Sequence, residues 1–136
     1  MINPMKLWLL IFVLCATSCG RAPTCSYPPS AMVQISAFTT ALDTFRVDCG
    51  RFPSTAEGLA ALTTRPAGLT ETKWHGPYLD AAIPKDPWEH DYVYACPGVH
   101  NTNGFDVYSL GPDGASKSGG EDYDDISNWP KRRTIR

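Results

Sequence analysis

The sequence predicts a small α+β domain, in which one amphipathic helix is followed by loops and an antiparallel hairpin. Apolar residues recur at helical spacing over residues 31–47. Two short runs rich in β-branched and aromatic residues follow at 92–96 and 105–110. The 136-residue chain is long enough for one hydrophobic core of ordinary size, but too short for two. We therefore expect a single globular domain over residues 31–136.

The first 19 residues are typical of a secretory signal peptide. Lys6 precedes the apolar run LWLLIFVL at residues 7–14, and small residues follow it. This run is shorter than the roughly 20 apolar residues that a transmembrane helix needs. A charged start, a short apolar stretch and a small-residue exit together predict export. We expect residues 1–19 to be the signal peptide and the protein to be periplasmic.

The end of the signal, ATSC at residues 16–19, is similar to a bacterial lipobox, with Ala16 where leucine is usual. We expect Cys19 to be lipid-modified, and ordinary cleavage nearby is the alternative. Acyl chains would hold the protein on a membrane because each buried methylene contributes about 0.8 kcal/mol. An aspartate directly after the cysteine would retain the protein in the inner membrane. Gly20 occupies this position instead, which predicts sorting to the outer membrane.

The predicted helix follows a proline-rich tether over residues 20–30. Its apolar residues recur mainly at steps of three and four, so one face of the helix should pack on the core. The residues on this face are Val33, Ile35, Phe38, Ala41, Leu42 and Phe45. Gly50 suits a left-handed cap and should end the helix.

A turn that leads into a short second helix is expected after the first. Ser54 or Thr55 is a suitable N-cap, and Glu57 lies where the acid of a capping box belongs. The segments 74–79 and 83–88 are rich in proline and aromatic residues and show neither helical nor strand periodicity. We expect them to be loops whose rings cover the core.

The two strand-like runs should form a hairpin. Residues 97–104 (PGVHNTNG) separate them and contain the proline, asparagine and glycine that turns favour. The sheet is therefore expected to be small and antiparallel.

The five cysteines suggest one disulfide. Cys15 and Cys19 belong to the signal. In an oxidising compartment we expect Cys49 and Cys96, each at the end of a predicted element, to pair, which leaves Cys25 over. A buried free thiol is the alternative for each. Zinc is not indicated, because no C-x-x-C pair occurs and the three histidines are scattered.

The candidate site is a glycine-rich segment at residues 109–126 that holds five carboxylates and one lysine. Carboxylates this close repel one another unless a cation lies between them. Oxygen ligands on a flexible loop suit Ca²⁺. A solvated acidic loop is the alternative, because the spacing does not match an EF-hand. Catalysis by these acids is disfavoured, because acids on one loop lack the apolar surroundings that would set their pKa values apart.

Other functions find little support in the sequence. The net charge of -2 gives no indication of a nucleic-acid partner. Cys49 could be a nucleophile with His75 or His100 as its base, but one cysteine and one histidine in a chain are weak evidence for such a pair. The sequence has no G-x-S-x-G, no phosphate-binding glycine loop and no H-E-x-x-H. We therefore expect a protein that is not an enzyme.

Several blocks, taken in order, resemble the major pseudopilin (G subunit) of bacterial type II secretion systems. They are ALDTFRVDCGRFPSTAEGL (41–59), WHGPYL (74–79), PKDPW (84–88), FDVYSLGPDG (105–114) and DISNW (125–129). The resemblance implies a long N-terminal helix packed on a small antiparallel sheet, with calcium bound in the loop before the C-terminal end. It also implies partners among other pseudopilins or secretion-system components.

The resemblance implies a ligand set for this calcium ion. By motif match the ligands are the carbonyl oxygens of Leu110 and Ala115 and the carboxylates of Asp113, Asp124 and Asp125. The length of this loop varies in the family, so Asp122 is an alternative to one of the acids.

The front of the chain departs from the family pattern. A pseudopilin has a prepilin peptidase site, an early glutamate and about twenty apolar residues that form the spine of the filament. Residues 1–30 match none of these, so we expect the domain to be carried by a signal peptide or lipid anchor. The leading hypothesis is a non-enzymatic pseudopilin-like subunit or accessory protein of type II secretion or related pilus-like machinery. The alternative is a free-standing, calcium-dependent periplasmic binding lipoprotein.

Overall fold

One long helix and a three-stranded sheet make up the domain, which a computed structural model describes over residues 29–131. The elements are helix α1 (Pro29–Cys49), 3-10 helix η1 (Leu59–Leu62) and strands β1 (Val93–Ala95), β2 (Asp106–Ser109) and β3 (Ile126–Ser127). The predicted signal peptide, most of the tether, Cys19 and Cys25 lie outside the described residues. Within residues 29–131, no helix is both long enough and apolar enough to span a membrane.

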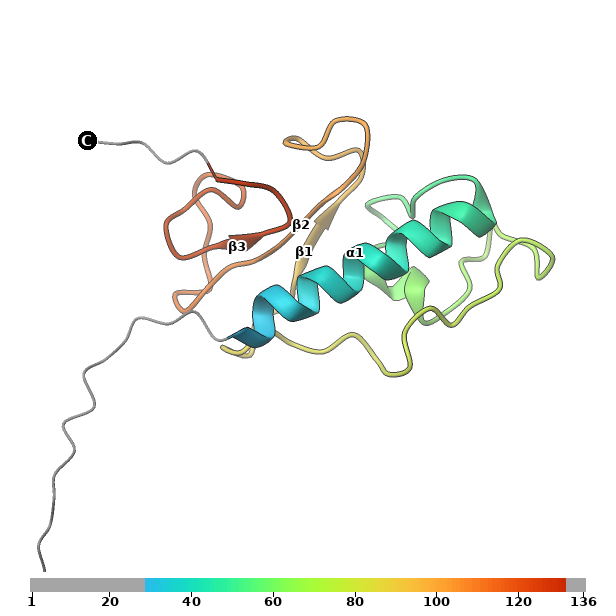
Figure 1. Cartoon of the computed structure of the whole chain (residues 1–136), viewed down its shortest axis with the longest axis horizontal. Coiled ribbons are helices and arrows are strands. Elements are labelled where there is room, and N and C mark those ends of the chain that lie inside the picture. Colours follow the sequence, from blue (N-terminus) through green and yellow to red (C-terminus); the bar gives the residue numbers. More distant parts are fainter. Residues whose placement is uncertain (1–28, 132–136) are drawn as a thin grey trace, which may run out of the picture.

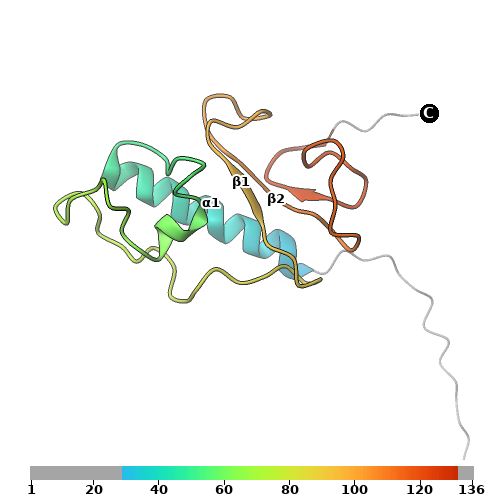
Figure 2. The ribbon, with the colours of Figure 1, turned by 180° about the vertical axis from the view of Figure 1, so that it is seen from behind.

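The sheet has the order β1-β2-β3, and both strand pairs are antiparallel. Val93 is paired with Tyr108, and Tyr108 is paired in turn with Ser127. Helix α1 lies along one side of the sheet, and the loop between β2 and β3 lies at the end where the helix begins (Figures 1 and 2). The α+β class and the hairpin are thus confirmed, whereas β3 was not predicted.

Helix α1 packs on the core through the predicted apolar face. Phe38, Leu42 and Phe45 are fully buried, and Ile35 is nearly so. Val33 was assigned to this face wrongly, because it is 66% exposed. Ala31, which lies one turn before Ile35, is fully buried on this face instead.

The end of α1 is formed as expected. Gly50 has a φ of 75°, and its amide donates to the carbonyl oxygen of Arg46 at 2.9 Å. A left-handed residue in this position is strained for any side chain with a Cβ atom, which explains the glycine.

Hydroxyl side chains on α1 bond back to the helix itself. The side-chain oxygens of Ser36, Thr39, Thr40 and Thr44 each donate to the carbonyl oxygen four residues earlier, at 2.9 to 3.1 Å. These bonds satisfy the hydroxyl groups without a partner from outside the helix.

The proline-rich segments cover the core without regular secondary structure, as the sequence predicts. The ring of Trp74 packs edge-on against Tyr78, and its indole nitrogen donates to the carbonyl oxygen of Ala61 at 3.1 Å. The ring of Tyr92 meets Phe38 edge-on at 5.0 Å. Burial raises the pKa of Tyr92 to about 12.

The turn after α1 is closed by the predicted capping box. The amide of Ser54 donates to Glu57 at 2.7 Å, and the amide of Glu57 donates to the hydroxyl of Ser54 at 3.3 Å. Hydrogen bonding to Arg51, which lies 2.6 Å away, lowers the pKa of Glu57 to about 2. The helix expected to follow is only the single 3-10 turn η1, and its N-cap is Gly58, so neither Ser54 nor Thr55 caps it as predicted.

Candidate functional site

The two ends of the loop at residues 110–125 lie against each other. Gly111 has a φ of 68°, and a Cβ atom at this position would clash with the carbonyl oxygen of Asp124. Only glycine therefore allows this approach. The fold brings Leu110, at the start of the loop, close to the predicted acidic ligands at its end.

Asp125 is the most deeply buried of the predicted ligands, at 2% exposed. One carboxylate oxygen, Oδ2, accepts from the Ser116 hydroxyl at 2.7 Å and from the Asp122 amide at 3.0 Å. The other, Oδ1, is buried and has no hydrogen-bond partner within residues 29–131. Burial raises the pKa of Asp125. A buried oxygen without a partner is an atom that a bound cation would satisfy.

The other predicted acidic ligands are less buried than Asp125. Asp113 is exposed, and its Oδ1 accepts from the Ala115 amide at 3.0 Å. Asp124 is half-buried. Across the described part of the chain, no three His, Cys, Asp or Glu side chains are grouped as a metal site. The calcium site therefore stays a prediction, whose oxygen donors lie on one loop.

Asp122 uses its carboxylate inside the loop. Its two oxygens accept from the Lys117 amide at 2.7 Å and from the Ser118 hydroxyl at 2.6 Å. These hydrogen bonds, that from Ser118 foremost, lower the pKa of Asp122. Asp122 thus holds the outer part of the loop in shape.

Lys131 places a cation on the same loop. Its ammonium nitrogen donates to the carbonyl oxygens of both Asp122 and Asp125. Burial lowers the pKa of Lys131, while the nearby carboxylates, Asp125 foremost, act to raise it. Sequence reasoning did not find this contact, because Lys131 looked like part of a basic C-terminal end.

A buried carboxylate outside the loop supports its base. The Oδ1 atom of Asp86 accepts from the amides of Trp88 at 3.0 Å and His90 at 2.8 Å, and Oδ2 accepts from the Ser109 hydroxyl at 2.6 Å. Ser109 in turn accepts from the amide of Gly111, and the His90 ring lies 3.0 Å from the Gly111 carbonyl. Asp86 therefore fixes the strand end from which the loop departs.

A second buried carboxylate, Asp106, shapes the turn of the hairpin. It is 3% exposed and accepts from the amides of Val99, His100 and Asn101 at 2.7, 2.8 and 2.9 Å. Three amides on one carboxylate stabilise a turn that lies outside the strands. Sequence analysis did not predict this role, because Asp106 is only an aspartate within a strand-like run.

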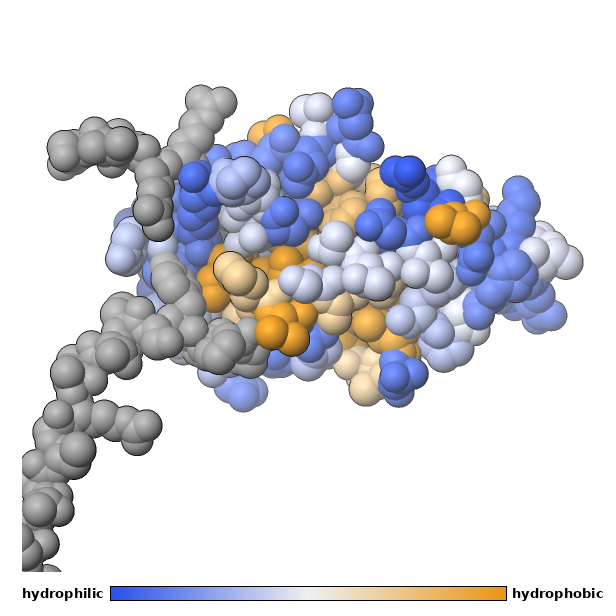
Figure 3. Space-filling model, viewed as in Figure 1, coloured by the Kyte–Doolittle hydropathy of each residue, from blue (hydrophilic) through white to orange (hydrophobic). Residues whose placement is uncertain are grey.

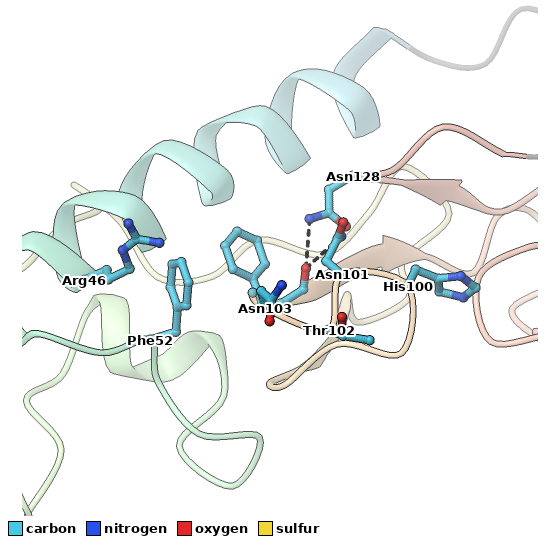
Figure 4. Close-up of a pocket in the computed structure, with 9 residues that line it drawn as sticks. Arg46, Phe52, His100, Asn101, Thr102, Asn103 and Asn128 are labelled. Carbon is cyan, nitrogen blue, oxygen red and sulfur yellow. Dashed lines mark hydrogen bonds between the residues drawn. The ribbon is translucent and has the colours of Figure 1, made fainter.

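A shallow groove of about 480 Å³ lies between α1 and this turn (Figure 4). Arg46 on α1 lies over the ring of Phe52, 5.2 Å from its centre. The side-chain amides of Asn101 and Asn128 both donate to the carbonyl oxygen of Phe105, at 3.0 and 3.2 Å. The groove is lined by no carboxylate or thiol of the described residues, so we assign it no chemistry.

Cys49 and Cys96 are both free thiols in the structure, so the predicted bridge is not formed there and stays a prediction. The Cys49 sulfur lies 3.5 Å from the carbonyl oxygen of Lys73. Burial raises the pKa of the Cys49 thiol, which opposes the thiolate that a nucleophile needs. The two bases considered for it are placed beside acids: His75 lies 3.4 Å from Asp48, and His100 lies 3.3 Å from Glu121.

Comparisons with known proteins agree on one family. The family model for type II secretion system protein G matches residues 22–129. The type II secretion system core protein G of Pseudomonas aeruginosa is 43% identical over 97 residues, and that of Vibrio cholerae is 41% identical over 101 residues. These matches cover 70% and 73% of this chain, and 66% of each relative.

A solved structure shows the same fold. The crystal structure of the major pseudopilin from the type 2 secretion system of enterohaemorrhagic Escherichia coli aligns with a TM-score of 0.60 and 34% identity. The alignment covers 74% of this chain and 84% of that chain. The resemblance that the sequence blocks indicate is therefore confirmed, and the chain belongs to the type II secretion system protein G family.

Proposed function

We propose that this chain is a non-enzymatic, exported subunit or accessory protein that assembles with pseudopilins of type II secretion machinery. The observation that supports this most directly is the match of the family model across almost the whole described domain. The chain spans 66% of the length of the curated relatives it matches first, so assembly itself is inferred from the shared domain. The relatives reported above are secretion subunits, which weighs against the alternative of a free-standing calcium-dependent lipoprotein.

The loop at residues 110–125 is proposed to bind calcium. Its donors would be the carbonyl oxygens of Leu110 and Ala115 and the carboxylates of Asp113, Asp124 and Asp125. The unpartnered, buried Oδ1 of Asp125 and the contact between the loop ends at Gly111 support this proposal. The ion would neutralise the repulsion between the acids and so hold the loop closed.

Attachment to a membrane is proposed from the sequence alone. The ATSC segment ending at Cys19 favours a lipid-modified N-terminus, and Gly20 favours the outer membrane over the inner one.

The assembly proposal is tested by capture with the full-length chain as bait. The tagged chain is produced in cells with an active type II secretion system, cross-linked and purified, and its partners are identified by mass spectrometry. We expect to recover other pseudopilins of that system. A tagged exported protein of similar size and charge is the control. Recovery of no secretion component by a folded bait would contradict the proposal and favour the free-standing alternative.

Calcium is expected to raise the stability of the domain. An ion that binds the folded loop far better than the unfolded chain stabilises by about 2.7 kcal/mol at a hundredfold excess over its Kd. The measurement is thermal unfolding in chelator, in calcium and in magnesium, which should substitute poorly because it demands a smaller octahedral shell.

The variant Asp124→Ala should lose most of this response. Asp80→Ala, which removes an exposed carboxylate outside the loop, should keep it. A melting temperature that calcium leaves unchanged in the native protein would refute calcium binding.

A further inference from the structure

The ammonium group of Lys131 binds the main chain at the end of the loop that is proposed to hold calcium. It donates to the carbonyl oxygens of Asp122 and Asp125, which belong to the turn that closes the loop. That turn is itself fixed, because the Asp125 amide donates to the Asp122 carbonyl at 3.2 Å. Main-chain carbonyl oxygens are ligands that Ca²⁺ accepts readily. The loop therefore presents its oxygen atoms to a cation that the chain itself supplies.

The acidic side chains of the loop also attract the ammonium group of Lys131. Glu121, Asp122, Asp124 and Asp125 all attract the ammonium group electrostatically. Lys117, the other lysine of this region, is exposed, and its main-chain amide donates to the Asp122 carboxylate. Lys117 also attracts the Asp122 carboxylate electrostatically, but Lys131 is the lysine whose ammonium group donates to the main chain of the loop.

We propose that Lys131 is a tethered cation that competes with calcium for the loop at residues 110–125. The ammonium group binds the main-chain carbonyl of Asp125, next to the carboxylates of Asp124 and Asp125 that are proposed to hold calcium. Two cations this close in a half-buried site repel each other strongly, so bound calcium should drive the ammonium group off the carbonyls of Asp122 and Asp125. In the absence of calcium, Lys131 keeps the loop closed. This inference rests on the proposed calcium binding.

The test is the calcium affinity of the full chain with Lys131→Met, measured by calorimetry. This variant keeps the apolar stem and removes the charge, so calcium should bind about tenfold tighter, the equivalent of one charge-assisted hydrogen-bonded contact released. Lys117→Met is the matched control, since it removes the same charge from the same loop without the carbonyl contacts. It should change the affinity about threefold at most, as an exposed charge does.

A second measurement uses the native protein and needs no variant. Labelling with an amine-specific reagent, followed by mass spectrometry, should find Lys131 protected in chelator and reactive in calcium, with Lys117 reactive in both. If native protein and Lys131→Met bind calcium with equal affinity, or the variant binds more weakly, competition is refuted and calcium binding stands. If neither binds calcium, the calcium proposal fails and the competition fails with it.

Discussion

Replacing Phe38 by alanine is expected to lower the free energy of unfolding by about 4 kcal/mol. The side chain is fully buried, and its ring meets that of Tyr92 edge-on at 5.0 Å. Removing the ring leaves a cavity between helix α1 and the loop that precedes β1. A loss of this size is a large share of the stability of a domain, which is about 5 to 15 kcal/mol.

Urea titration followed by circular dichroism measures this loss. Val33→Ala is the control on the same helix, because Val33 is 66% exposed and its truncation should change stability by about 0.5 kcal/mol or less. Equal losses for the two variants would mean that the helix does not pack on the sheet through the Phe38 face.

Replacing Asp106 by alanine is expected to cost about 3 kcal/mol and to release the hairpin turn. The carboxylate is almost fully buried and accepts from three successive amides, at Val99, His100 and Asn101. Hydrogen bonds to a charged acceptor contribute about 1.5 to 3 kcal/mol, and their loss leaves donors without a partner. Hydration of the turn in the variant recovers part of this loss.

Amide hydrogen exchange separates the local effect from the global one. In Asp106→Ala the three turn amides should exchange much faster than the amides of β2. Asp91→Ala, which removes a carboxylate 85% exposed and paired with Lys85, should leave the turn amides protected. Unchanged protection in Asp106→Ala would show that the turn does not depend on this carboxylate.

Local patterns predicted the parts of the fold that depend on neighbouring residues. The apolar spacing of α1, its end at Gly50, the capping box of Ser54 and Glu57 and the hairpin strands are all properties of short segments, and each is found in the structure. Strand β3 was missed, because two residues carry no periodicity of their own. Its pairing with β2 depends on the loop that brings it there.

The segment proposed as the site was chosen from the sequence, but the contacts that support it were not predicted. The acidic composition of the loop identified the segment, and the family resemblance supplied a ligand set. The supports come from far along the chain: Asp86 bonds to Ser109, and Lys131 bonds to Asp122. Such contacts are set by the tertiary fold. An aspartate before a proline and a lysine in a basic tail have no local feature that reveals them.

The hydroxyl groups of α1 have a consequence for how its outer surface meets its surroundings. A hydropathy scale treats Ser36, Thr40 and Thr44 as water-seeking. The face of the molecule in Figure 3 carries pale residues of intermediate hydropathy beside blue and orange ones. Each hydroxyl is already bonded to the carbonyl four residues before it, so it gains less from water than the scale assumes. What threonine then offers outward is chiefly its methyl group. Removing water from the exposed side of this helix therefore costs less free energy than the hydropathy of its residues suggests.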